Sequence, residues 1–166
     1  MARTEILLTI VGIVILGTLA IIFRDILLYD DNNEAEAEYQ MMAYDLLDKF
    51  IGEVASKSFD EASVNGRPSD IPDSFTSPSN LGPEADEIYP NFDDVDDYHD
   101  FSFTDTTSGG MDYTIKVDIG YVTFDDTEVF LSTQSNMKRM NVYIISKSLP
   151  NEIRMSRIFS YLGSKI

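Results

Sequence analysis

Residues 6–23 form an uninterrupted run of eighteen uncharged, mostly branched apolar residues, and this run constrains the fold more than any other feature of the chain. A helix of this length is about the minimum that crosses the hydrocarbon core of a bilayer, which takes roughly 17–25 residues. We therefore expect an N-terminal helix that inserts in a membrane. A cleaved secretory signal is disfavoured, because its charged region would contain an acid and no small-residue cleavage site precedes the polar stretch at residues 30–38.

Glu5 lies at the mouth of this apolar helix and separates two interpretations of it. In an ordinary signal anchor, the positive-inside bias holds Arg3 on one side of the membrane and Arg24 snorkels at the far interface. A carboxylate at the mouth of an apolar helix costs free energy unless another group pairs with it, so Glu5 implies a partner. Arg3 of the same chain is one candidate, and a group on another chain is the other.

Met1, Glu5 and the run ILLTIVGIVILGTLAIIF resemble the mature N-terminus of type IV pilins and type II secretion pseudopilins. The resemblance implies that a prepilin peptidase removes a leader, that the amine of Met1 is methylated, and that Glu5 pairs with the terminal amine of a neighbouring subunit. Met1 is then the mature terminus, the alternative being an initiator methionine. The chain departs from the family in carrying Arg3 and in having no proline in the apolar segment, so we expect a continuous helix.

Beyond residue 29, the apolar pattern predicts an α+β head, a long helix packed on a small antiparallel β-sheet. Helical spacing relates Ala43, Leu46, Leu47, Phe50, Ile51 and Val54 and predicts an amphipathic helix at residues 34–57. Five of the six prolines fall in residues 65–110, which predicts a long irregular connection at 60–110. Alternation of apolar and polar residues predicts a sheet at 111–163. The apolar positions are Tyr113, Ile115, Val117, Ile119 and Tyr121, then Met140, Val142 and Ile144, and more loosely those from Ile153 to Tyr161. The expected division is thus 1–29 for the membrane helix and 30–166 for the head.

Charge is unevenly distributed along the chain, whose formal net charge is -17. Residues 30–105 carry 21 acidic and 3 basic residues, whereas residues 110–166 carry 6 acidic and 7 basic ones. Phosphate recognition needs Lys and Arg gathered on one face, so we expect no nucleic acid as a partner. The chain has no cysteine and a single histidine, His99, which excludes a disulfide framework and a zinc-thiolate site.

The segment FDDVDDYHDF at residues 92–101 is the densest acidic cluster and the candidate cation site. Calcium takes six to eight oxygen ligands, and closely spaced carboxylates can supply several of them. The candidate ligands are Asp93, Asp94, Asp96, Asp97 and Asp100. Their spacing does not match an EF-hand loop, so a solvated acidic loop or a subunit contact is the alternative. Calcium is the one cofactor that the sequence suggests.

These features together predict a structural protein with no enzymatic activity, because the sequence has neither a GxSxG motif nor a phosphate-binding glycine loop. By the resemblance, its partners are identical or homologous pilin subunits, the prepilin peptidase and the assembly machinery. Its expected location is the inner membrane before assembly, followed by an extracellular filament or a periplasmic pseudopilus. The alternative function is a monomeric, membrane-anchored binding module whose acidic loop captures calcium or a basic partner.

Overall fold

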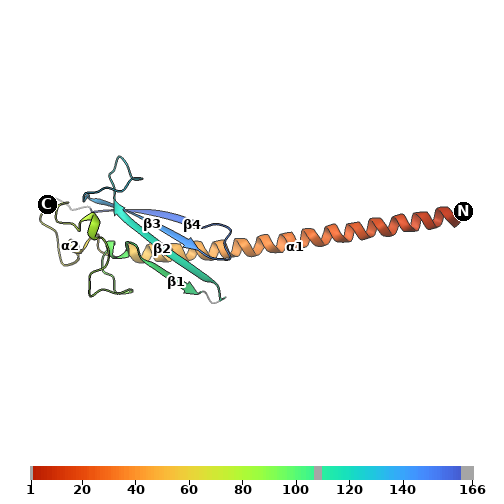
Figure 1. Cartoon of the computed structure of the whole chain (residues 1–166), viewed down its shortest axis with the longest axis horizontal. Coiled ribbons are helices and arrows are strands. Elements are labelled where there is room, and N and C mark those ends of the chain that lie inside the picture. Colours follow the sequence, from red (N-terminus) through yellow and green to blue (C-terminus); the bar gives the residue numbers. More distant parts are fainter. Residues whose placement is uncertain (1, 107–109, 162–166) are drawn as a thin grey trace. The chain divides into compact units, whose positions relative to one another are not determined.

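The computed structural model shows an α+β chain with one long helix and a four-stranded antiparallel sheet, which confirms the predicted fold class (Figure 1). It describes residues 2–106 and 110–161, and for residues 2 and 26–33 the backbone alone. The helices are α1 (Ala2–Val54), the short α2 (Glu61–Val64), and the 3-10 helices η1 (Pro78–Asn80) and η2 (Asp96–Tyr98). The strands are β1 (Ser102–Thr106), β2 (Asp112–Tyr121), β3 (Met137–Ile145) and β4 (Ile153–Ser160).

The chain divides into two units, Met1–Gln40 and Met41–Ile166, and we call the second unit the head. The sequence placed this division at residue 29, where the apolar run ends. The structural boundary comes later because residues 34–40 of α1, although helical, have no fully buried side chain, and the first one belongs to Ala43. The start of the core, rather than the end of the apolar run, therefore sets the boundary.

The first unit contains a segment of α1, Arg3–Asp25, that is long and apolar enough to cross a membrane by length and composition. Its 23 residues have a mean hydropathy of 2.9, and none of them is buried. Within the segment, Gly12 and Gly17 leave the helix uninterrupted, as expected for a chain without proline at these positions. The segment Arg3–Asp25 therefore presents an exposed apolar helical surface.

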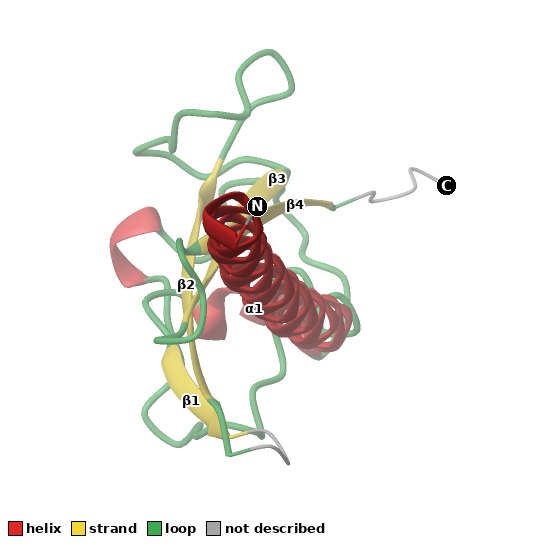
Figure 2. Ribbon diagram, turned by 90° about the vertical axis from the view of Figure 1, so that its right-hand side faces the viewer, coloured by secondary structure: helices red, strands yellow, loops and turns green. Residues whose placement is uncertain are grey.

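The last turns of α1 supply the head with a buried helical face. The buried residues are Ala43, Leu47, Phe50, Ile51 and Val54, whose spacing of three or four places them on one side of the helix, as predicted. Figure 2 shows this part of α1 lying beside the sheet. The helix ends at Val54 rather than at residue 57, because the N–H groups of Ser56 and Lys57 bond to carbonyls only three residues back.

The sheet is a simple meander in the order β1-β2-β3-β4, each strand pairing antiparallel with its neighbour in the sequence. The inward side chains of β2 lie opposite those of β3, so that Ile115 faces Ile144 and Val117 faces Val142. The predicted alternation is confirmed, since the buried set is Tyr113, Ile115, Val117, Ile119, Tyr121, Met140, Val142 and Ile144. These side chains form the sheet's contribution to the core.

The connection predicted at residues 60–110 requires a correction, because strand β1 lies within it. Apolar alternation does not reveal this strand, since Phe103 is its one apolar residue and pairing with β2 holds the other residues in place. The connection is also packed by aromatic rings, with centroid separations of 4.9 to 6.0 Å. The rings belong to Phe50, Tyr89, Phe92, Tyr98, Phe101 and Phe103. Part of the predicted loop is therefore core.

Candidate functional sites in the apolar helix and the acidic connection

Glu5 lies in the first turn of α1 with an exposed side chain, directly before the apolar residues. The Thr9 hydroxyl donates to the Glu5 backbone carbonyl at 2.6 Å, so this bond does not involve the Glu5 carboxylate. Arg3 is also exposed, and no ion pair joins it to Glu5 in the part of the chain that the structure describes. Met1, the predicted source of the amine, lies outside the described residues. The geometry thus leaves the Glu5 carboxylate available to a group from another molecule.

Lys138 forms the centre of a buried ionic network in the head. Its side chain has 0% exposure, and its ammonium group lies 2.8 Å from Asp60 Oδ2 and 2.5 Å from Asp96 Oδ1. A third donated bond, of 2.9 Å, reaches the Phe59 carbonyl. Because all three ammonium protons have acceptors, the cost of burying this charge is offset by direct bonds.

Asp60 and Tyr121 extend this network. Asp60 is fully buried, caps α2 by accepting a bond from the Ala62 N–H at 3.2 Å, and also accepts the Thr76 N–H at 3.0 Å. The Tyr121 hydroxyl lies 2.9 Å from Asp60 Oδ2, and its pKa is raised by burial first and then by the Asp60 charge. The network therefore fastens the start of the connection to the inner face of β2 and β3.

The five aspartates predicted as one cation site do not converge. Asp94 Oδ1 accepts the N–H groups of Asp96 and Asp97, and Asp96 turns its carboxylate to Lys138. Asp97 Oδ2 accepts the N–H groups of Asp93 and Asp94 at 3.0 and 3.1 Å. Asp100 has a positive φ of 56° and an exposed carboxylate near His99. The segment is not the solvated loop that was one alternative expectation, because Asp94, Asp96 and Asp97 are all buried. Asp93 Oδ1, Asp94 Oδ2 and Asp97 Oδ1 are buried without a hydrogen-bond partner among the described residues.

A different set of carboxylates does converge, namely Glu84, Glu87 and Asp97. One carboxylate oxygen from each lies within 4.8 Å of the others. Burial raises the pKa of Glu87 to about 8, with the charge of Asp97 as the second cause. The pKa of Glu84 is raised by burial as well. Glu84 and Glu87 were not identified from the sequence, because they lie outside the dense aspartate run and only the fold brings them to Asp97.

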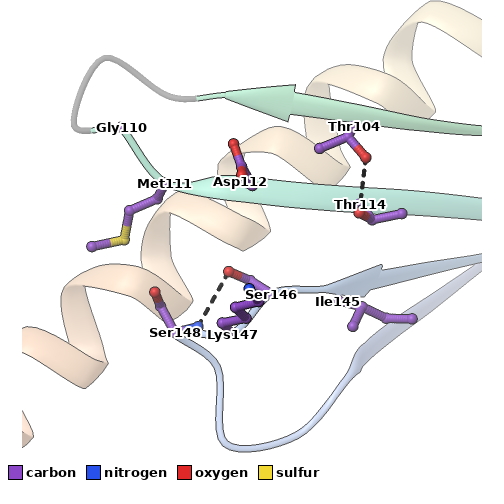
Figure 3. Close-up of a pocket in the computed structure, with 9 residues that line it drawn as sticks. All are labelled: Thr104, Gly110, Met111, Asp112, Thr114, Ile145, Ser146, Lys147 and Ser148. Atoms are coloured by element: carbon purple, nitrogen blue, oxygen red, sulfur yellow. Dashed lines mark hydrogen bonds between the residues drawn. The ribbon is translucent and has the colours of Figure 1, made fainter.

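Two further places in the head bring polar side chains together. His99 lies 3.7 Å from Asp100 and 3.8 Å from Asp118, but Asp100 is 87% exposed. A pocket of about 610 Å³ lies between the ends of β1 and β2 and the segment after β3 (Figure 3). The hydroxyls of Thr104 and Thr114 bond to each other at 2.9 Å, and Ser146 Oγ accepts the Ser148 N–H at 3.3 Å. None of its described lining residues has a buried polar atom without a partner, so its chemistry points to no ligand.

Comparison with known proteins does not assign the chain to a family. No family model, no curated protein and no solved structure matches it.

Proposed function

We propose that this chain is the structural subunit of a filament of the type IV pilus or pseudopilus kind. One observation carries the proposal: a single helix, α1, begins with an exposed apolar segment and ends as the core helix of an α+β head. A helix of this composition is stable in a bilayer or against other apolar helices, because water solvates its side chains poorly. The same segment can therefore hold the subunit in the membrane and later pack against its copies.

The exposed large side chains of the first unit support packing by many subunits. Ile6, Leu7, Leu8, Ile13 and Leu16 are each 59% to 72% exposed, and they are distributed around the helix rather than along one stripe. A helix that is apolar on all sides is stable when it is surrounded, either by lipid or by neighbouring helices. The proposed location follows: the inner membrane before assembly, then an extracellular filament or a periplasmic pseudopilus.

Glu5 is the proposed assembly residue. In a bundle of apolar helices its carboxylate needs a positive partner, and the terminal amine of Met1 on a neighbouring subunit has the required charge. The proposal assigns the chain no enzymatic reaction. Its partners are other copies of the chain or homologous subunits, together with the peptidase and machinery that such assembly uses.

Substitution of Glu5 by Ala tests this role. We expect Glu5→Ala to insert in the membrane normally, since loss of a carboxylate lowers the cost of placing the helix in lipid. Filament assembly should fall sharply, because removing one partner of a buried charge pair typically costs about 3–5 kcal/mol for each subunit. The measurement is the yield of sheared fibres at matched membrane levels, with Glu34→Ala as the control, since Glu34 is an exposed carboxylate of α1 beyond the apolar segment.

Three outcomes are informative. Normal fibre yield from Glu5→Ala would refute the assembly role. An equal loss in Arg3→Ala would indicate that Arg3 pairs with Glu5 within one chain and that both mutants disturb the seating of the helix in the membrane. The absence of any sheared fibre from the unmodified chain would favour the alternative function, a monomeric membrane-anchored binding module.

A further inference from the structure

Glu84, Glu87 and Asp97 come together from two segments of the connection between α1 and the sheet. Glu84 and Glu87 belong to one turn, which is closed by the Glu87 N–H donating to the Glu84 carbonyl at 3.0 Å. Asp97 lies on η2, ten residues further along. The turn and η2 place one oxygen of each carboxyl group within 4.8 Å of the others, so three acidic groups share one small volume.

The Asp97 side chain is oriented for this cluster by its own backbone contacts. It is 1% exposed, and its Oδ2 is held by the N–H groups of Asp93 and Asp94. Its Oδ1 is buried and accepts no hydrogen bond from any described residue, and the same holds for Glu84 Oε2 and Glu87 Oε2. Buried carboxylate oxygens without a partner are costly, and native structures rarely leave them so.

The contrast with the neighbouring ionic network shows what these oxygens lack. Asp60 and Asp96 are also buried carboxylates of the same connection, and Lys138 supplies the cation that neutralises them. The ion pairs that the structure shows between described residues do not include Glu84, Glu87 or Asp97. A cation from solution would complete the second cluster as Lys138 completes the first.

We propose that Glu84, Glu87 and Asp97 bind one hard divalent cation of the calcium class. Calcium binds oxygen at about 2.3–2.6 Å and takes six to eight ligands, so three carboxyl oxygens that lie within 4.8 Å of one another can reach a single ion. Magnesium binds at about 2.0–2.1 Å in near-ideal octahedral geometry and is usually held by only one or two carboxylates, so a cluster of three carboxyl groups favours calcium. Backbone carbonyls and water can complete the coordination shell. The site belongs to the head alone and is independent of the filament proposal.

Calcium titration of the full chain in detergent micelles, after removal of metals with a chelator, tests the proposal. We expect calorimetry to show one bound Ca²⁺ and thermal unfolding to shift to a higher temperature, because a ligand of the native state alone stabilises it. Glu87→Gln, which keeps the shape and removes one charge, should weaken binding by about tenfold or more. The matched control is Asp86→Asn, an exposed carboxylate beside Glu87, which should bind as the unmodified chain does.

The sign of the stability change in Glu87→Gln distinguishes a cation site from carboxyls that merely share a proton. With chelator, the variant should melt no lower than the unmodified chain, because the uncharged Gln amide can donate to the neighbouring carboxylates and does not repel them. With saturating Ca²⁺, it should melt below the unmodified chain, because a ligand is gone. A higher melting temperature for the variant in both conditions, or no Ca²⁺ binding by the unmodified chain at millimolar concentration, would overturn the proposal.

Discussion

Lys138 illustrates how one residue determines the packing of an acidic segment. Its side chain lies on the inward face of β3, opposite Tyr121 of β2, in a row that otherwise holds apolar residues. The Phe59 ring lies 4.7 Å from its ammonium group and adds a cation–π contact to the three donated bonds. The only positive charge in this buried network therefore lies between two aspartates from distant segments.

Replacement of Lys138 by Met should be strongly destabilising. Methionine fills a similar volume but leaves the buried carboxylates of Asp60 and Asp96 without a cation, which typically costs about 3–5 kcal/mol. The measurement is the free energy of unfolding by denaturant. Lys147→Met is the control, since Lys147 is exposed and its loss should change stability by no more than about 0.5 kcal/mol. A loss below about 1 kcal/mol for Lys138→Met would contradict the assigned network.

Some of this residue-scale chemistry could be predicted from the sequence. Lys138 has the same strand parity as Met140, Val142 and Ile144, so an inward lysine in need of an acid was detectable from the alternation alone. Its partners were not detectable, because Asp60 and Asp96 lie 78 and 42 residues away. The density of aspartates at residues 92–101 made them the candidate ligands in the sequence. Their roles are decided by burial and by backbone contacts, and both of these depend on the fold.

At the scale of elements, apolar periodicity predicted α1, β2 and β3 well and the connection poorly. The α1 face and the alternation of β2 are repeated over many residues, so each was recognisable without tertiary information. Strand β1 has one inward apolar residue, Phe103, and it is a strand because β2 offers it hydrogen-bonding groups. The aromatic rings at residues 89–103 have no regular spacing, so their packing was not predictable from a period.

Two glycines in different elements should respond to alanine with opposite signs. In β2, a Cβ on Gly120 would lie 2.5 Å from the Phe130 ring, which packs over that strand, so Gly120→Ala should cost about 1–3 kcal/mol. In α1, a Cβ on Gly52 meets no atom within 4 Å, and Gly52→Ala should gain up to about 1 kcal/mol of helix stability. Denaturant unfolding of both variants measures the difference. Stabilisation by Gly120→Ala would contradict the assigned packing of Phe130.

At the scale of the whole molecule, the head should fold without the apolar helix. Every fully buried apolar side chain among the described residues lies at Ala43 or beyond. A chain beginning at residue 30 should therefore show mixed helix and strand by circular dichroism. Its cooperative melting temperature should fall within about 5 °C of that of the full chain. A broad, non-cooperative transition would show that the first unit contributes to the core.

The Lys138 network can form only late in the synthesis of the chain. Strand pairing in the meander joins neighbours in the sequence, but Asp60 meets its cation only across 78 residues. A ribosome releases all of the connection's acidic residues before it releases Lys138. Until β3 emerges, Asp60 and Asp96 stay hydrated, because no cation is yet present to offset the cost of burying their carboxylates. Translation products that stop short of β3 therefore carry the acids without their counter-charge, and such fragments present proteases with an open chain.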